Sequence, residues 1–242
     1  MPLLIKGRYR ASRAETAAGI RAAQELRSLA FGTAHLDADR FDEICTHVLI
    51  HDQRSGALVC TFRLLMLEGG GELDQSYSAQ FYGLHGLQDF QGRMVEMGRF
   101  CIHPDWQDPD ILRVAWAAMT AFVDDNQVEM LFGCSSFAGT ETGTYLDAFA
   151  MLKHRHLGPK RWLPRVKAPH VFRYAARLRR KPDAKQAMLR MPPLLRTYLM
   201  MGGWVSDHAV VDQQMNTLHV FTGLEIGKVP PARKRLLRAL VG

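Results

Sequence analysis

The chain has 242 residues, of which 47% are hydrophobic, and it carries a formal net charge of +7 at pH 7. This length allows one large domain or a domain with an extension, and the apolar content is enough for a buried core, which excludes a disordered tail. The positive charge favours an acidic partner, and nucleic acid, an anionic membrane and an acidic protein all fit it.

The spacing of cysteines and histidines restricts the chemistry further. The four cysteines are scattered without a C-x-x-C pair, and the sequence has neither a signal peptide nor an uninterrupted apolar run of about 18 residues. We therefore expect a reduced, cytoplasmic protein that does not span a membrane. The ten histidines are dispersed, so no metal site is expected. Cys101 and His103 would share a strand face, which suggests either a thiol nucleophile or a buried, inert cysteine.

The first predicted element is a helix followed by an acidic segment. Ser12 and Glu15 have the spacing of a capping box and precede a helical pattern that runs to Phe31, with Gly32 at its end. The acidic segment that follows, residues 34–43, is either a solvated loop or an acidic lip that holds a cationic or amine-bearing substrate, because carboxylates attract an ammonium group at close range. Its carboxylates are Asp37, Asp39, Asp42 and Glu43.

Residues 46–66 predict a β-hairpin, since two β-rich runs flank a turn from Asp52 to Gly56. Arg63 stands inside the second run, between Phe62 and Leu64. A buried charge at this position needs a partner, so Arg63 could pair with an acidic side chain or with a substrate carboxylate. A surface arginine on an edge strand is the alternative.

The stretch from Met94 to Met119 has the strand-turn-helix pattern with which α/β enzymes build sites at strand ends. Glu96 and Arg99 would face opposite sides of a regular strand, but Gly98 between them could mark a bulge. A bulge could turn both charges toward one cleft and leave an N–H group that polarises an acyl carbonyl. An ordinary ion pair on a sheet face is the alternative.

The next helix and strand also carry local signals. Asp108 and Pro109 predict the cap and the first residue of the helix. A central strand over residues 128–137 then ends in Ser135 and Ser136, before a helix predicted over residues 142–156. The two hydroxyls could donate to a thioester or protonate a leaving thiolate, or they could cap the following helix.

The tract from Lys153 to Lys181 is strongly basic, and no acidic residue occurs between Asp147 and Asp183. Aromatic residues are interleaved, as on a nucleic-acid-binding face, but no recognisable binding motif accompanies them. The last residues predict a basic amphipathic helix whose apolar side chains could dip into a bilayer surface or dock on the protein. Those side chains are Leu236, Leu237, Leu240 and Val241.

A set of residues from these segments resembles the signature of the acyl-homoserine-lactone synthases, which belong to the GNAT fold. They are Arg27, Phe31, Asp39, Asp42, Arg63, Glu96 and Arg99. Longer motifs resemble a sister family more specifically, the L-ornithine Nα-acyltransferases of ornithine-lipid synthesis. The motifs are EMGRFCIHP, FGCSSFAG, PPLLRTYLMMG and VVDQQMNTLHVF, and the resemblance covers the chain from Arg8 to Leu224.

The resemblance implies an α/β, GNAT-like fold whose mixed, splayed central β-sheet is flanked by helices and followed by a basic C-terminal extension. We expect an acyltransferase core over residues 1–157 and an extension over residues 158–242 that completes the sheet and the acyl and carrier-protein site. Residues 215–219 depart from the family pattern. This departure leaves ornithine, glutamine or another amino acid open as the acceptor.

The turn after the central strand bears on the acyl donor. Acetyl-CoA-dependent members of the fold hold pyrophosphate with a Gln/Arg-x-x-Gly-x-Gly/Ala turn, whereas this turn reads WQDPDIL and has no glycine. The resemblance therefore implies acyl carrier protein as donor, with its own phosphopantetheine and no separate cofactor, and no nucleic acid. The acidic carrier would dock on Lys153, Lys160, Arg161 and Arg165.

The reaction implied by the resemblance is transfer of a (3-hydroxy) fatty acyl group to the α-amino group of L-ornithine, which gives lyso-ornithine lipid. Glu96, Arg99 and Ser136 are the expected catalytic residues, with Glu96 as the base, directly or through water. The expected substrate-binding residues are Arg27, Phe31, Asp39, Asp42, Arg63, Phe100, Cys101 and Ser135.

These substrate-binding residues have separate expected roles. Asp39 or Asp42 would bind the side-chain ammonium of the acceptor. Arg63 or Arg99 would bind its carboxylate. The backbone near Phe100 or Cys101 would hold the oxyanion.

Two other functions fit the sequence. One is a signal synthase in which S-adenosylmethionine supplies the amine, although the long extension after the core argues against it. The other is a non-catalytic basic protein that binds nucleic acid or membrane, which predicts salt-sensitive binding and no thioester consumption. An acyltransferase with this C-terminal helix could also make peripheral contact with the anionic inner face of the cytoplasmic membrane.

Overall fold

A computed structural model describes residues 2–241, and the chain divides into two compact units. The first unit consists of Met1–Met66, Val95–Val128 and Pro230–Gly242. The second consists of Leu67–Met94 and Glu129–Val229. The functional boundary expected at residue 157 stays a prediction, because proximity in space does not define which residues act together.

The first unit contains a sheet in the order β1-β2-β3-β4-β6. Its strands are β1 (Pro2–Lys6), β2 (Tyr9–Arg13), β3 (Thr46–Asp52), β4 (Leu58–Leu67) and β6 (Met94–Ile102). Strands β1 to β4 are antiparallel neighbours, so the predicted hairpin is confirmed as β3 and β4. In its turn the side chain of Asp52 accepts hydrogen bonds from the amide and hydroxyl of Ser55.

The helices of the first unit follow their local signals, with one correction. Ser12 lies in β2, so the predicted capping box is wrong, and Thr16 caps α1 (Ala17–Phe31) by accepting from the Gly19 amide. The N-terminal residues pair as strands because their backbone groups find partners in β3, which a local capping pattern does not reveal. Gly32 ends α1 in the left-handed conformation, as predicted. A short 3₁₀ turn, η1 (Arg40–Glu43), follows.

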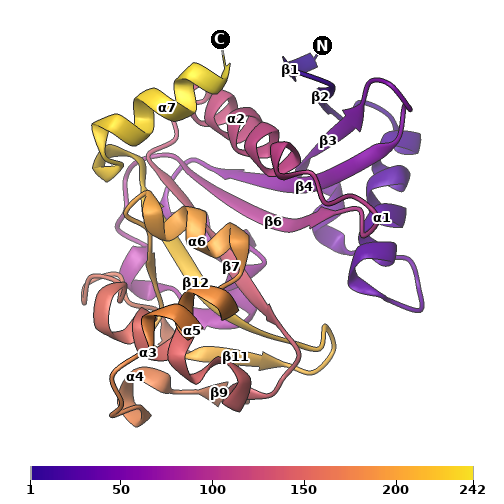
Figure 1. Cartoon of the computed structure of the whole chain (residues 1–242). Helices are drawn as coiled ribbons and strands as arrows, with labels where there is room; N and C mark the ends of the chain where they lie inside the picture. The colour runs from indigo at the N-terminus through magenta and orange to yellow at the C-terminus, as the bar shows by residue number, and fades with distance from the viewer. Residues whose placement is uncertain (1, 242) are drawn as a thin grey trace. The chain divides into compact units, whose positions relative to one another are not determined.

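Helix α2 (Pro109–Asp125) begins at the predicted Asp108 cap and buries the apolar stripe that its spacing predicts. Helix α7 (Pro231–Val241) lies beside α2 (Figure 1). Nε and Nη2 of Arg238 each donate to a carboxylate oxygen of Asp124 at 2.9 Å, and the ammonium of Lys6 donates to the carbonyl of Ala239. The C-terminal helix therefore docks on the protein. Leu236 remains 60% exposed, and the side chains of Leu240 and Val241 lie outside the described residues.

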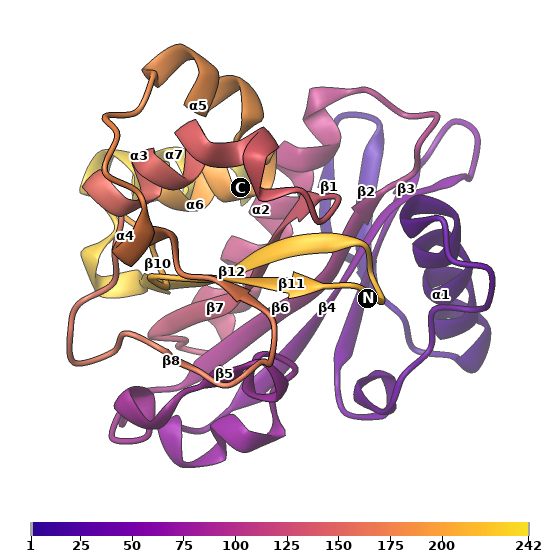
Figure 2. The ribbon, with the colours of Figure 1, turned by 90° about the horizontal axis from the view of Figure 1, so that it is seen from below.

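The second unit contains the antiparallel sheet β7-β12-β11-β9, with β10 also paired to β12. The strands are β7 (Met130–Ala138), β9 (Val171–Phe172), β10 (Trp204–Val205), β11 (Ala209–Asp212) and β12 (Thr217–Glu225). Strands β5 (Tyr82–Gly83) and β8 (Arg165–Val166) form a separate pair, seen at the lower edge of Figure 2.

Helices cover one face of this sheet. They are α3 (Leu146–Arg155), α4 (Tyr174–Arg177), α5 (Ala184–Arg190) and α6 (Pro193–Met200). Phe149, Tyr174 and Leu195 from these helices pack with Leu218 and Val220 of β12. Short 3₁₀ turns connect the remaining segments: η2 (Gly70–Gln75), η3 (Ser78–Gln80), η4 (His85–Leu87), η5 (Thr142–Tyr145) and η6 (Ile226–Lys228).

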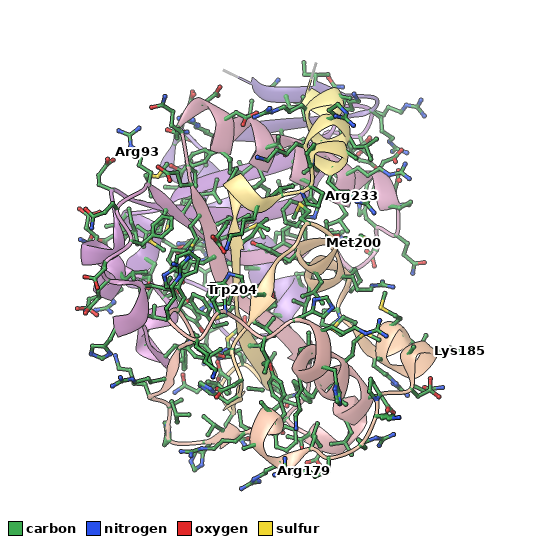
Figure 3. The ribbon with its side chains drawn as sticks, turned by 90° about the vertical axis from the view of Figure 1, so that its left-hand side faces the viewer. Arg93, Arg179, Lys185, Met200, Trp204 and Arg233 are labelled. Atoms are coloured by element: carbon green, nitrogen blue, oxygen red, sulfur yellow. The ribbon has the colours of Figure 1, made fainter. Side chains whose placement is uncertain are left out.

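Trp204 shows why β12 contains a glycine. A side chain at Gly223 would place its Cβ 2.5 Å from the indole of Trp204, so only glycine allows this ring to lie on the strand. Figure 3 shows Trp204 inside the second unit, whereas Arg179 and Lys185 extend to its surface. None of the helices within residues 2–241 is long and apolar enough to cross a membrane.

Candidate functional site

A network of arginine and aspartate side chains joins α1, the following acidic segment, β4 and β6 in the first unit. We call it the arginine–aspartate network, and its members are Arg27, Asp37, Asp39, Asp42, Arg63 and Arg99. Each arginine contacts two of the aspartates. Three positive and three negative side chains therefore balance one another.

Arg27 and Asp42 form the buried centre of this network. The two terminal nitrogens of Arg27 donate to the two carboxylate oxygens of Asp42, each at 2.7 Å, in a bidentate pair. Arg27 also lies 3.0 Å from Asp37 through Nε and donates to the Asp37 carbonyl through Nη2. The side chain of Arg27 is only 1% exposed, so the aspartates offset the cost of burying its charge.

Arg63 and Arg99 form the more open side. Arg63 donates to Asp39 at 2.6 and 2.8 Å and to Asp42 at 2.7 Å. Arg99 donates to Asp37 at 3.1 Å and to Asp39 at 3.3 Å. Asp39 and Arg99 are the most exposed of these partners, with 25% and 14% of their side chains accessible. Arg63 is thus a buried, paired arginine, and the alternative of a surface position is wrong.

The paired carboxylates are held in their charged form. Burial raises the pKa of Asp42, but hydrogen bonds from Arg27 and Gln24 outweigh it and bring this pKa well below its usual range. For Asp39, burial again raises the pKa, and the hydrogen bond and charge of Arg63 lower it further than that. Asp39 and Asp42 are therefore ionised at neutral pH.

Glu96 lies on β6, the strand that carries Arg99, and is 5% exposed. Burial raises the pKa of Cys45 to about 12, with the charge of Arg63 lowering it and that of Glu96 raising it, so both charges act on this thiol. Glu96 and Arg99 both lie on β6, and the expectation that a bulge turns both charges toward one cleft stays a prediction.

The irregularity in β6 lies one residue later than expected. Arg99 has φ +52°, in the left-handed region, whereas Gly98 has no positive φ. A residue with a Cβ adopts this conformation only when its surroundings hold it, at a cost of about 1–3 kcal/mol. The contacts to Asp37 and Asp39 hold the Arg99 side chain in place. The expected N–H donor to an oxyanion stays a prediction.

Phe31, Phe100 and Cys101 occupy different surroundings. Phe31 is the half-buried last residue of α1, and Phe100 stacks on Phe62 with centroids 5.9 Å apart. Burial raises the pKa of the Cys101 thiol to about 12, so it stays protonated, as in the buried, inert alternative. Within the described residues, no group of three or more His, Cys, Asp or Glu could hold a metal ion.

The two serines of β7 lie on opposite faces of the second unit's sheet. In the register with β12, Ser135 is opposite Val220 and Ser136 is opposite His219. Ser135 is buried, and its Oγ accepts from the hydroxyl of Thr222 at 2.9 Å. Ser136 is exposed on the other face. Both lie within β7, so the alternative that they cap the following helix is wrong.

The four expected carrier-docking residues are not equivalent. Lys153 is half-buried and its ammonium donates to the carbonyl of Leu178 at 2.6 Å. Lys160, Arg161 and Arg165 are exposed. The guanidinium of Arg161 lies 4.1 Å from the ring centroid of Trp162, which presents its charge at the surface.

Several supporting residues were not selected from the sequence. Asp37 contacts two arginines, Gln24 donates to Asp42 at 3.0 Å, and Nε2 of His47 lies 3.0 Å from the Asp42 carbonyl. Asp37 belongs to the acidic segment, so its position there was a usable signal. Gln24 and His47 carry no local pattern that distinguishes them.

Comparison with known proteins first gives the class. Residues 20–117 match the model of an acetyltransferase (GNAT) domain. The α/β architecture, with a mixed central sheet flanked by helices, is that of GNAT acyltransferases, so the predicted fold class is confirmed. The structure of FeeM, an N-acyl amino acid synthase from uncultured soil microbes, is similar with a TM-score of 0.54 at 9% identity, over 94% of this chain and 99% of that one.

Sequence relatives then give the family. The chain is 31% identical over 229 residues to the L-ornithine N(alpha)-acyltransferase of Rhodobacter capsulatus, covering 88% of each protein. It is 30% identical over 236 residues to that of Brucella abortus, covering 89% of this chain and 84% of the relative. The chain belongs to the L-ornithine N(alpha)-acyltransferase family, which confirms the resemblance found in its motifs.

Proposed function

We propose that this GNAT acyltransferase moves a (3-hydroxy) fatty acyl group from acyl carrier protein to the α-amino group of L-ornithine, or of a related amino acid such as glutamine, and so forms a lysolipid. The observation that carries the proposal is the buried Glu96 on the same strand as Arg99, which pairs with the partly open Asp39, in a chain 31% identical to an L-ornithine N(alpha)-acyltransferase. Such a cluster offers a base, a carboxylate and a guanidinium to an amino acid.

The first unit supplies the acceptor site in this proposal. Asp39 and Arg99, the more exposed members of the network, bind the side-chain ammonium and the carboxylate of the amino acid. Arg27 and Asp42 are buried and bond to each other, so their part is to hold the segment that carries Asp39. Arg63 fixes Asp39 from β4. Phe31 lines the approach at the end of α1.

Glu96 is the base that removes a proton from the acceptor ammonium, directly or through water. It is buried on the strand that also carries Arg99, and a general base must reach the ammonium within hydrogen-bond distance or through one water molecule. The neutral amine then attacks the thioester carbonyl, and the backbone near Phe100 or Cys101 binds the oxyanion. Since a thioester is already activated, positioning contributes most of the rate.

The second unit supplies the donor site. Ser136, whose hydroxyl is exposed on β7, donates to the thioester or to the leaving thiolate, with Ser135 supporting the strand through Thr222. Lys160, Arg161 and Arg165 form the exposed positive surface for the acidic carrier, with Lys153 holding the nearby Leu178 carbonyl. The phosphopantetheine arrives on the carrier, so the enzyme needs no separate cofactor.

The direct test combines the purified protein with a long-chain 3-hydroxyacyl carrier protein and single amino acids, followed by mass measurement of the products. We expect an N-acylated ornithine, with glutamine as the alternative acceptor because residues 215–219 depart from the family motif. Release of free carrier thiol should accompany it. Absence of acyl transfer to every amino acid contradicts the proposal.

A membrane location accompanies this function. The product has a fatty chain, and α7 presents Leu236 next to Arg233, Lys234 and Arg235. Peripheral contact with the anionic inner face of the cytoplasmic membrane would place the enzyme where its product partitions into lipid.

A further inference from the structure

His219 has a buried ring nitrogen that no described residue satisfies. The residue lies in β12 and is 2% exposed, and its Nε2 has no hydrogen-bond partner. The ring of Phe81 meets the imidazole edge-to-face with centroids 5.0 Å apart, and the ring of Tyr82 lies 5.6 Å away. An unsatisfied polar atom among aromatic side chains is unfavourable unless something binds it.

The hydrogen bonds of Tyr82 define the tautomer of this imidazole. The Tyr82 hydroxyl lies 2.8 Å from the backbone carbonyl of His219, and a carbonyl can only accept. The same hydroxyl lies 3.1 Å from Nδ1 of His219. Because its single proton goes to the carbonyl, its oxygen must accept from Nδ1–H. In a neutral ring Nε2 is then the unprotonated nitrogen, a hydrogen-bond acceptor.

The charge state of the ring agrees with this assignment. Burial lowers the pKa of His219 to about 4, with Asp212 opposing the shift and His208 adding to it. The imidazole is therefore neutral near pH 7, and it is a weak base for an ammonium group. Its chemistry is that of an acceptor for an O–H or N–H group.

His219 shares its face with the exposed end of the proposed donor site. Directly opposed residues of antiparallel strands project to the same side, so Ser136 lies next to His219. We call this side the His219 face, and it carries Cys134, Ser136, His219 and Phe221. Ser136 is exposed, and the half-buried Phe81 covers the imidazole edge-to-face, so binding at His219 requires the Phe81 ring to shift.

We propose that Nε2 of His219 accepts a hydrogen bond from a hydroxyl group on the acyl chain and thereby selects hydroxylated acyl donors. This inference rests on the proposed function and adds to it the residue that reads the chain. The aromatic wall of Phe81 and Tyr82 suits an alkyl chain, and the lone acceptor within it favours a chain that brings its own donor. An ether or keto oxygen at the carbon that otherwise carries the hydroxyl group has no proton to donate.

Donor analogues test the proposal on the unchanged enzyme. Carrier protein is loaded with chains of equal length that are 3-hydroxylated, 3-methoxylated, 3-keto or unsubstituted, and kcat/KM is measured for each. We expect the 3-hydroxy donor to exceed the other three by about tenfold, the effect of one hydrogen bond to a buried acceptor. Equal use of the keto and hydroxy donors, or of the unsubstituted donor, overturns the proposal.

Variants assign the effect to this residue. His219→Phe keeps a planar ring without the acceptor and should reduce the preference for the hydroxylated donor about tenfold, whereas His219→Gln offers an amide oxygen and should restore part of it. His156→Phe changes a half-buried histidine of the second unit, at the end of α3, and should keep the wild-type preference.

These experiments distinguish failure of the His219 proposal from failure of the proposed function. If no donor supports acyl transfer, the proposed function fails. If transfer occurs and His219→Phe retains the wild-type preference, the role of His219 alone is refuted. Circular dichroism shows whether each variant folds, and if His219→Phe does not, the donor series on the unchanged enzyme decides.

Discussion

Arginine side chains serve different purposes in the two units. In the first unit, Arg27 and Arg63 are buried and each meets two aspartates. In the basic tract of the second unit, Arg161 and Arg165 are exposed, and Arg161 rests on the ring of Trp162. A buried arginine must be neutralised inside the protein, whereas an exposed one keeps its field available to a partner.

Buried side-chain nitrogens without a hydrogen-bond partner among the described residues occur in both units, such as Nε of Arg27 and Nδ1 of His47 in the first and Nε2 of His219 in the second. Each aspartate of the arginine–aspartate network contacts two arginines, and these contacts fix the geometry of this region. The His219 face leaves one buried acceptor free among the described residues. In the proposed function, the network would position acceptor-binding groups, while the second unit would recognise the donor.

The strongest test of the comparison removes an arginine from the centre of the network. Arg27→Ala leaves Asp42 and Asp37 buried with unbalanced charge, and it should lower the free energy of unfolding by about 3–5 kcal/mol. Urea denaturation measures this change. The matched control is Arg21→Ala in the same helix, whose pair with Glu25 is exposed and should contribute less than about 1 kcal/mol. Equal effects of the two changes would remove the structural role of the network.

The next test asks whether the network also borders a reaction site. Glu96→Gln preserves shape but removes the proposed base, so kcat/KM for acyl transfer should fall by about 10²-fold or more while the fold is retained. Glu43→Gln, an exposed carboxylate of η1, should leave the rate unchanged. Wild-type turnover in Glu96→Gln would exclude this glutamate as the base.

Charge reversal tests the exposed side of the comparison. Replacing Lys160, Arg161 and Arg165 by Glu should raise KM for the acyl carrier protein about tenfold, with little change in kcat, because the encounter with an acidic partner depends on these charges. The salt dependence of kcat/KM should decrease as well.

The control makes the same net charge change elsewhere. Reversal of Arg10, Arg54 and Arg113, which are exposed in the first unit, should leave KM for the carrier near the wild-type value. A similar rise in KM in both triple variants would show that only net charge matters. The proposed docking surface would then be wrong.

The smallest expected effect concerns the glycine before Arg99. A Cβ at Gly98 would lie 3.7 Å from Nε of Arg63, an ordinary contact, and Gly98 has no positive φ. Gly98→Ala should therefore be neutral or stabilise by up to about 1 kcal/mol. Gly32→Ala, at φ +65°, should destabilise by about 1 kcal/mol in the same thermal unfolding measurement. A large loss at Gly98 would restore glycine as the residue that the bulge requires.

Local chemistry explains what could be predicted. The caps at Asp108 and Gly32 and the hairpin of β3 and β4 depend on residues close together in sequence, and each was found where expected. The family motifs likewise lie within short segments. Ser12 shows the limit, since its capping pattern was present but the backbone around it pairs with β3.

The amino-acid sequence by itself determined the GNAT class, the family, the hairpin and the acidic segment that faces Arg63. Only the tertiary structure decided that Arg99 takes the left-handed conformation, that Ser135 and Ser136 lie on opposite faces, and that Nε2 of His219 has no partner among the described residues. These features depend on contacts between distant segments, such as Arg99 with Asp37 or Tyr82 with His219, and no local pattern specifies which groups such contacts will satisfy.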